Sequence, residues 1–210
     1  MLVIVIIVLF LGLILFVRVF MLLMRNQSRQ ILDWPVGIMQ RVALALPGAG
    51  ESGLALAKSG FESYLAAVKY WGPAQSVAMP SRAVDEVWHN AMLHSRFYAA
   101  LCQERVGWFV HHEPGPVPTE EHAAEPCRAR KIDPRELDEL ARAWVGASAH
   151  EGIDPMGTDI PTLFAADRLV GVKGFAYAAD SSVSIIPVDL IQEAARRLGA
   201  PIAQKRWFRR

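Results

Sequence analysis

Histidine side chains are concentrated in one short part of this 210-residue chain. Four of its six histidines, His89, His94, His111 and His112, lie within 24 residues, and Asp85 precedes the first of them by about one helical turn. Neutral imidazoles and carboxylates are common ligands of zinc and non-haem iron, and histidine also transfers protons near neutral pH. The cluster therefore indicates a candidate metal site, for Zn or Fe, formed by Asp85, His89, His111 and His112.

Whether these side chains can meet depends on the shape of the segment that carries them. On a straight helix Asp85 and His89 share one flank, because residues four apart are neighbours on a helix. Such a helix carries the chain about 27 Å from His89 to Gly107, whereas five extended residues return at most about 17 Å. A shared site therefore requires a bend at His94-Ser95, where Ser95 would cap a second helix.

The same residues also have a purely structural interpretation. A partly buried His89 beside Trp88, with its tautomer fixed by Asp85, needs no metal. Cys102 falls on the apolar stripe of the helix and is expected in the core, while Glu151 is a further carboxylate that a metal could recruit. The sequence contains no nucleophile with a matching base and no phosphate-binding glycine loop. No catalytic residue and no cofactor-binding residue is therefore predicted.

Apolar periodicity predicts a mainly α-helical domain over residues 34–199, with about five to six helices. Asp133-Pro134 is a strong helix start, with Asp at the cap and Pro at the first helical position, and Gly152 is placed to end that helix. The Pro- and Glu-rich stretch 113–130 is expected to be a mobile surface loop, and 174–186 is either a loop or a small hairpin. The predicted helices cover approximately residues 31–46, 54–71, 81–107, 133–150, 161–170 and 188–198.

The first 24 residues predict a transmembrane anchor. They contain about 22 apolar positions, or roughly 33 Å of helix, enough for a hydrocarbon core of about 30 Å. Arg25 and Arg29 follow in a basic juxtamembrane linker, residues 25–33, and by the positive-inside rule they place the rest of the chain in the cytoplasm. The predicted localisation is the inner cell membrane, with a single pass through residues 2–24 and a cytoplasmic C-terminal domain.

The charges of the chain are balanced and only its end is basic. Twenty-two basic residues against 21 acidic ones leave no overall field to attract nucleic acid, which is excluded as a partner. The tail, residues 200–210, combines cations with aromatic side chains and is either solvated or in contact with anionic lipid. The residues concerned are Lys205, Arg206, Trp207, Phe208, Arg209 and Arg210.

Two segments resemble a known family. The first contains Val84-Asp85-Glu86-Val87-Trp88-His89, Tyr98, Cys102, Gly107 and His111-His112-Glu113-Pro114, and the second contains Ala143-Trp144, Glu151-Gly152-Ile153-Asp154-Pro155, Pro161-Thr162-Leu163-Phe164-Ala165 and Gly174-Phe175. Over roughly residues 80–180 this pattern resembles bacterial members of the glycine-rich domain-containing protein-like family. The chain departs from that family at Ala91, where a second histidine is usual, at Ser95, where proline is common, and in lacking the glycine-rich tail. The resemblance implies a membrane-associated or cytoplasmic domain without an established activity.

Two functions are open on these grounds. The anchor and the missing catalytic set favour a membrane-anchored cytoplasmic helical domain that serves as a non-catalytic interaction module for an unidentified protein partner. The alternative is a metal-binding domain with a hydrolase or sensor role, in which His89 and His111 or His112 hold Zn or Fe.

Overall fold

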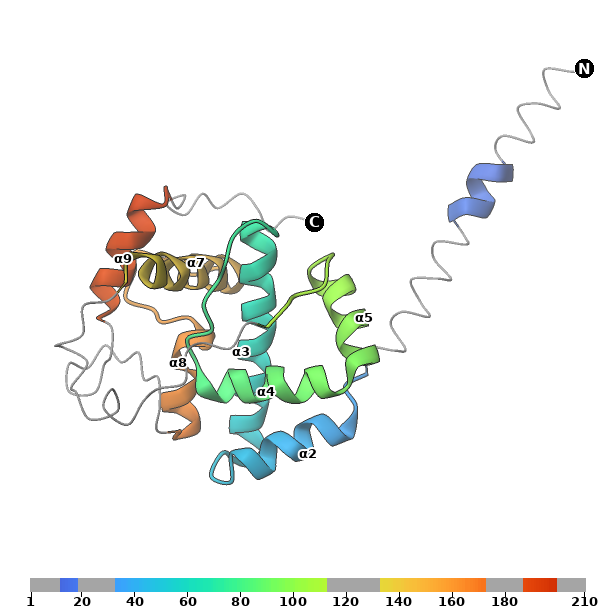
Figure 1. The fold of residues 1–210 in the computed structure, drawn as a ribbon, viewed down its shortest axis with the longest axis horizontal. Helices are drawn as coiled ribbons and strands as arrows, with labels where there is room; N and C mark the ends of the chain where they lie inside the picture. Colours follow the sequence, from blue (N-terminus) through green and yellow to red (C-terminus); the bar gives the residue numbers. More distant parts are fainter. Residues whose placement is uncertain (1–11, 19–32, 113–132, 173–186, 200–210) are drawn as a thin grey trace, which may run out of the picture.

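The structure is a computed structural model of the chain that describes residues 12–18, 33–112, 133–172 and 187–199. These residues form helices joined by turns and extended segments, with no strand among them (Figure 1). The mainly α-helical character predicted from the sequence is confirmed for this part of the chain. Beyond residues 12–18, the helices are α2 (Val36–Ala45), α3 (Gly50–Trp71), α4 (Arg82–Leu93), α5 (Ser95–Arg105), α7 (Pro134–Glu151), α8 (Thr162–Val170) and α9 (Val188–Arg197).

The predicted transmembrane anchor requires correction. Of residues 1–24, the structure describes only 12–18, which are helical. No helix in the described ranges combines the length and the apolar character needed to cross a membrane. The prediction of a single-pass inner-membrane protein with a cytoplasmic domain is therefore wrong as judged by these residues.

Several other predictions concern residues outside the described ranges. These are the linker up to residue 32, the loop 113–130 with His122 and Cys127, the segment 174–186, and the tail 200–210.

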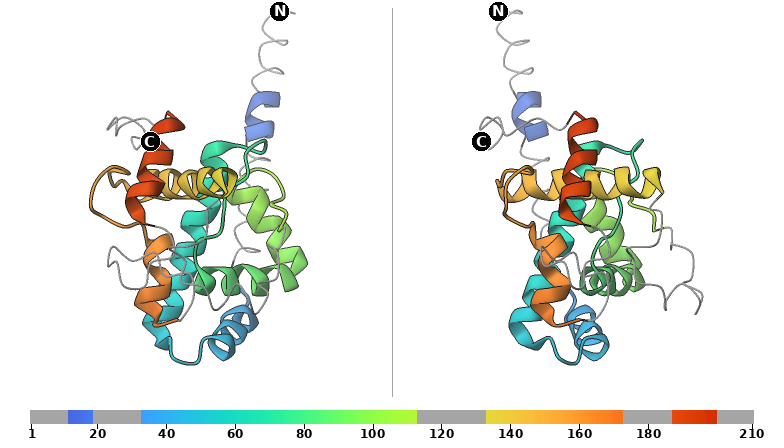
Figure 2. Two further views of the ribbon diagram at one scale, coloured as in Figure 1. Left: turned by 60° about the vertical axis from the view of Figure 1, so that its left-hand side comes forward. Right: turned by 90° about the vertical axis from the view of Figure 1, so that its left-hand side faces the viewer.

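Helix α3 is the central element of the fold. It packs against α7, α8, α4 and α2, and α7 in turn packs against α9. Different views agree that α7 crosses near one end of α3, while α2 lies near the other end (Figures 1 and 2). The crossing with α7 is very close, because a Cβ added at Gly146 would lie 2.5 Å from the Cα atom of Ala67. A glycine is required at this point for the two backbones to approach.

A carboxylate of α8 fixes the start of α4. Asp167, which is fully buried in α8, accepts hydrogen bonds from the Ser81 hydroxyl at 2.7 Å and from the backbone N–H groups of Arg82 and Ala83. The Ser81 hydroxyl also caps α4 by accepting from the N–H of Val84. Free N–H groups at a helix start are thus satisfied and the helix dipole meets a negative charge. This arrangement positions the first turn of α4, which carries the candidate site.

The local end signals of α7 are confirmed. Asp133 caps the helix by accepting a hydrogen bond from the N–H of Arg135, and Pro134 is its first residue. Gly152 ends the helix in the left-handed conformation, with φ of 71°. Capping depends only on neighbouring residues, which is why both ends of this helix can be predicted from the sequence.

The predicted helix 81–107 is divided in two at His94. Helix α4 ends at Leu93 and α5 begins at Ser95, with His94 at φ −96° and ψ 63° between them. The required bend therefore exists. The described part of residues 34–199 contains seven helices, whereas about five to six were predicted, because the bend divides one predicted helix into two. Ser95, however, does not cap α5, whose start has no side-chain cap.

Candidate metal centre

Two residues of the candidate site lie on α4. Asp85 and His89 are one turn apart on this helix, and Asp85 Oδ2 lies 3.6 Å from His89 Nδ1. Their neighbours Val84, Val87 and Trp88 are buried. Because the apolar side of α4 is fixed in the core, Asp85 and His89 are held on the flank that borders solvent.

The third residue arrives on a short arm after α5, residues 106–112. The arm turns at Gly107, whose φ of 105° is suited to glycine. Val110 is buried, with 7% of its surface exposed, and its carbonyl accepts a hydrogen bond of 2.5 Å from the Tyr98 hydroxyl. The same hydroxyl accepts a bond of 2.8 Å from the Trp88 indole N–H. Tyr98 therefore connects α4 to the arm and brings His112 back to α4.

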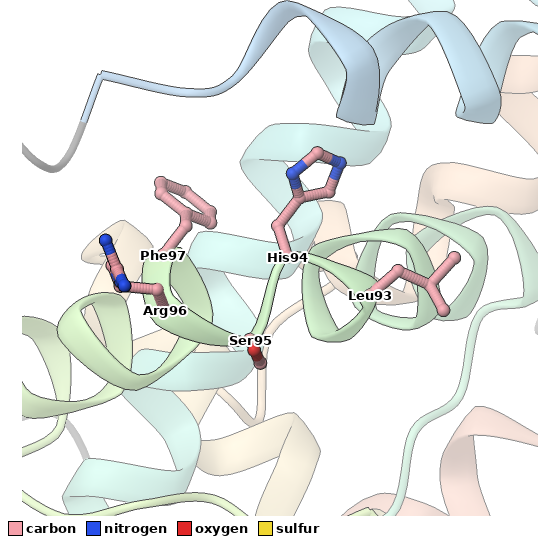
Figure 3. Close-up of a pocket in the computed structure, with 5 residues that line it drawn as sticks. All are labelled: Leu93, His94, Ser95, Arg96 and Phe97. Atoms are coloured by element: carbon pink, nitrogen blue, oxygen red, sulfur yellow. The ribbon is translucent and has the colours of Figure 1, made fainter.

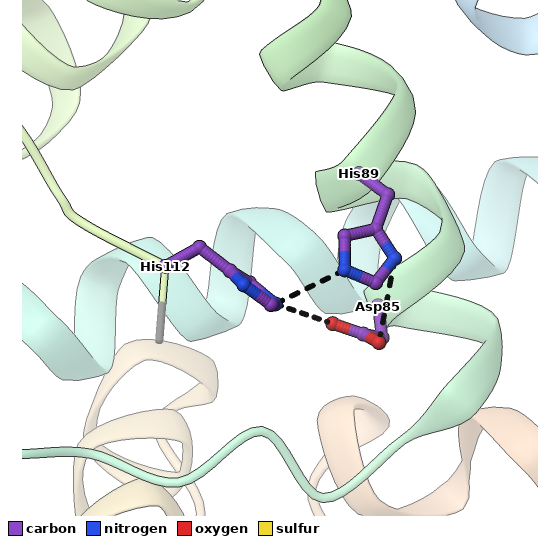
Figure 4. Close-up of side chains that lie close together, drawn as sticks. All are labelled: Asp85, His89 and His112. Carbon is purple, nitrogen blue, oxygen red and sulfur yellow. Dashed lines mark hydrogen bonds and ion pairs between the residues drawn. The ribbon is translucent and has the colours of Figure 1, made fainter. Parts of the chain in front are cut away.

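The three side chains converge (Figure 4). His112 Nε2 lies 3.1 Å from His89 Nε2 and 3.4 Å from Asp85 Oδ1. One ligand atom from each of Asp85, His89 and His112 can be chosen so that all three lie within 4.8 Å of one another. Within the described residues this is the one such group of His, Cys, Asp or Glu side chains.

These separations suit a single metal ion. Nitrogen and oxygen ligands at about 2.1 Å from one ion lie about 3.0 Å apart in octahedral geometry and about 3.4 Å apart in tetrahedral geometry. The distances of 3.1 and 3.4 Å from His112 Nε2 fall in this range. His112 Nε2 therefore lies from His89 and from Asp85 at the separations expected between ligands of one ion.

The carboxylate of Asp85 favours one tautomer of His89. Without an ion, the Nε2 atom of one histidine donates to that of the other, and the direction depends on the tautomers. A metal needs a lone pair on both Nε2 atoms, so each ring must carry its proton on Nδ1. Asp85 Oδ2 faces Nδ1 of His89, and a carboxylate at this position favours that tautomer. Asp85 can thus support His89 with one oxygen and bind an ion with the other.

The surroundings of the site are apolar on one side and open on the other. The Trp88 ring packs edge-on against His112, with ring centroids 4.5 Å apart. The side chain of His112 is 15% exposed, that of Asp85 28% and that of His89 45%. The site therefore has a buried aromatic wall and an exposed rim at His89.

Buried ionisable groups beside the site are held neutral. Burial raises the pKa of Tyr64, and the negative charges of Asp85 and Glu139 raise it further. Burial also raises the pKa of Tyr98, although the hydrogen bond from Trp88 lowers it. Both phenols are therefore protonated near neutral pH, and Tyr98 keeps the proton that it donates to Val110.

Not every predicted ligand belongs to the site. The exposed His111 packs against Phe109, with ring centroids 4.9 Å apart, and His112 is the member of the pair that reaches α4. Glu151 is occupied elsewhere, since it accepts hydrogen bonds from Ser63 and Thr162. The structure therefore brings together three of the four predicted residues and leaves out His111.

The remaining candidates have structural positions. Cys102 is fully buried, as predicted, and burial raises the pKa of its thiol, while contacts with the Val110 backbone and the Tyr98 hydroxyl lower it. The His94 ring is directed toward α2 at an open surface depression between α4 and α5 (Figure 3). There its atoms lie 3.7 Å from where a Cβ would stand on Gly37. His94 therefore packs at the corner and does not join the cluster.

The connecting role of Tyr98 was not predicted. The sequence places Trp88 and Tyr98 on one apolar stripe, which explains their burial but not the bond between their polar atoms. A buried tyrosine and a buried tryptophan each need a hydrogen-bond partner. That requirement is the signal that could have linked them.

The fold and the cluster define an α-helical protein with a His–His–Asp group at its surface. Within this class, the chain belongs to the UCP032817-like family, whose match covers residues 24–192. No curated protein and no solved structure was found that matches the chain.

The family match corrects the resemblance to the glycine-rich domain-containing protein-like family, which nothing else supports. Most of the pattern behind that resemblance has a simple packing origin. Val84, Trp88, Tyr98 and Cys102 are all buried where α4 and α5 meet the core. Such a pattern reports a helix corner with an aromatic core rather than membership of that family.

Proposed function

We propose that this chain is a metal-binding helical domain that holds one divalent ion, Zn or Fe, through His89, His112 and Asp85. The observation that carries the proposal is the convergence of three ligand atoms from two segments, with His112 Nε2 3.1 Å from His89 Nε2 and 3.4 Å from Asp85 Oδ1. Two imidazoles and one carboxylate form a ligand set found with both zinc and non-haem iron.

The packing around the cluster supports this proposal. Two imidazole nitrogens that lie 3.1 Å apart are at the separation expected for two ligands of one ion. If Asp85 and His89 were only a solvated flank of α4, the fold would have no need to place His112 against them. The buried Val110 and the Tyr98 bond nevertheless hold the arm at this place.

The interaction-module function stays a prediction. Exposed large apolar side chains in the described residues include Val36 and Leu44 on α2, Leu93 on α4 and Leu169 on α8. They are spread over three helices and do not by themselves define a surface for a protein partner. No observation therefore favours this function over metal binding.

The test is the metal content and affinity of the full chain, prepared without an affinity histidine tag. After removal of metal with a chelator, titration with Zn²⁺ and, without oxygen, with Fe²⁺ should give one ion per chain. His89→Ala and His112→Ala should each weaken binding by at least about tenfold, the lower end of what outer-shell changes already cause.

His111→Ala is the matched control, since it removes an imidazole next to the site that does not face the cluster. It should bind metal as the unchanged protein does. Absence of stoichiometric metal, or equal losses for His111→Ala and His112→Ala, would contradict the proposal.

A further inference from the structure

We infer that the metal-loaded site is also a binding site for a small anion, such as a carboxylate, which enters an open coordination position of the ion. This inference rests on the proposed metal-binding function. It concerns what the site does once the ion is present, and it follows from the number, the charge and the exposure of the ligands.

The ligands that the described part of the chain provides are too few to complete the coordination of the ion. The described residues supply three donors within reach of one another, from Asp85, His89 and His112. Zinc takes at least four ligands, and iron in a site with two histidines and one carboxylate takes up to six. Three-ligand sites of this kind hold water or an exchangeable ligand at the remaining positions, whereas structural zinc sites are closed by four protein ligands.

The charge of the ligand set favours an anion at that position. A divalent ion with two neutral imidazoles and the single carboxylate of Asp85 keeps a net charge of about +1. A monoanion neutralises this charge, whereas a second cation is repelled. A metal-bound water that loses its proton has the same charge as such an anion, so hydroxide is the natural occupant in the absence of other ligands.

The exposure of the ligands provides access. Trp88 covers His112 from the buried side, with ring centroids 4.5 Å apart. The rim of the site is formed by His89, whose side chain is 45% exposed, and by Asp85, at 28%. An anion that approaches over His89 therefore reaches the ion without displacement of a core side chain.

Cobalt substitution tests the inference directly, because Co²⁺ usually replaces Zn²⁺ in such sites and has visible absorption bands that respond to each ligand. The full chain loaded with one Co²⁺ is titrated with sodium azide and, separately, with sodium acetate. We expect a saturable change in the visible bands with one anion per metal, while cobalt stays with the protein on a desalting column. The metal-free protein is the control and should bind neither anion at this site.

The possible outcomes separate the two proposals. If Co²⁺ does not bind, the metal-binding function fails and the inference fails with it. If Co²⁺ binds one per chain but its bands do not respond to either anion, the inference is overturned while the metal-binding function stands. A response that accompanies loss of cobalt into the column filtrate also overturns it, because the anion has then removed the ion instead of joining it.

Discussion

The Tyr98 hydroxyl is the most informative single group to remove, since it connects the core of α4 to the arm that carries His112. It accepts the Trp88 indole N–H at 2.8 Å and donates to the Val110 carbonyl at 2.5 Å. Tyr98 is 1% exposed, so water does not replace either bond. Tyr98→Phe deletes one oxygen atom and keeps the ring.

The expected loss of stability follows from the groups left behind. A buried polar group without its partner costs about 1–3 kcal/mol. Tyr98→Phe leaves two such groups, the Trp88 N–H and the Val110 carbonyl, so the free energy of unfolding should fall by about 2–4 kcal/mol, allowing for partial relaxation of the arm. Tyr64→Phe is the matched control, because within the described ranges the Tyr64 hydroxyl makes one hydrogen bond, 3.2 Å to the Val77 carbonyl. It should cost about 1 kcal/mol.

Tyr98→Phe should also weaken metal binding more than Tyr64→Phe does. Val110 precedes His112 by two residues, so an arm that has lost its bond to Tyr98 holds His112 less firmly. Loss of a supporting group around a metal ligand typically weakens binding by about 10–100-fold. We expect a weakening in this range for Tyr98→Phe and little change for Tyr64→Phe.

Two measurements on each variant test the expected losses of stability and of metal affinity. Urea unfolding of the metal-free proteins, followed by far-ultraviolet circular dichroism, gives the stability, and competition with a chelator of known affinity gives the metal dissociation constant. The reasoning is refuted if Tyr98→Phe is no less stable than Tyr64→Phe. It is also refuted if Tyr98→Phe is destabilised as expected but binds metal as tightly as the unchanged protein.

Two further predictions concern the fold. Gly146→Ala would place its Cβ 2.5 Å from the Cα of Ala67; we expect urea unfolding to show a loss of about 1–3 kcal/mol, because overpacking outweighs the gain of about 1 kcal/mol in helix propensity. Gly37→Ala, whose Cβ would meet His94 at an ordinary 3.7 Å, is the control and should be neutral or slightly stabilising, and equal effects at the two sites would sink the argument. Burial raises the pKa of Cys102 above the ordinary thiol value of 9.0. The stabilisation from the buried neutral thiol is therefore complete below pH 9.0 and is lost as the pH rises through the pKa that the thiol has in the folded protein. Stability measured by urea unfolding should therefore fall above about pH 9, and by less in Cys102→Ala; an equal fall in both proteins would contradict this.

The sequence predicts those parts of the fold that depend on near neighbours. The start of α7 at Asp133-Pro134 and its end at Gly152 follow from capping rules, and the buried stripe of α4 follows from helical periodicity. The bend at His94 was predicted only as a condition for the site, because no local signal there is decisive. Ser95 was expected to cap α5 and does not.

The composition of the site depends on contacts that are distant in the chain. Whether His111 or His112 reaches α4 is decided by the register of the arm, which the burial of Val110 and its bond to Tyr98 fix. A pair of adjacent histidines carries no information about that register. Glu151 was a reasonable ligand by composition, but its carboxylate instead satisfies the start of α8 at Thr162.

The arm has a consequence for the rate at which the proposed site exchanges its ion. Val110 and the Tyr98 bond hold the arm, whereas α4 is fixed along its length by the core. Local opening of such a segment costs less free energy than global unfolding and occurs far more often. Each opening removes His112 and leaves Asp85 and His89 in place on the helix, so an ion leaves through a state with two ligands. For the proposed site, the lifetime of a bound ion should therefore be set by the opening of these few residues, and exchange should need no unfolding of the core.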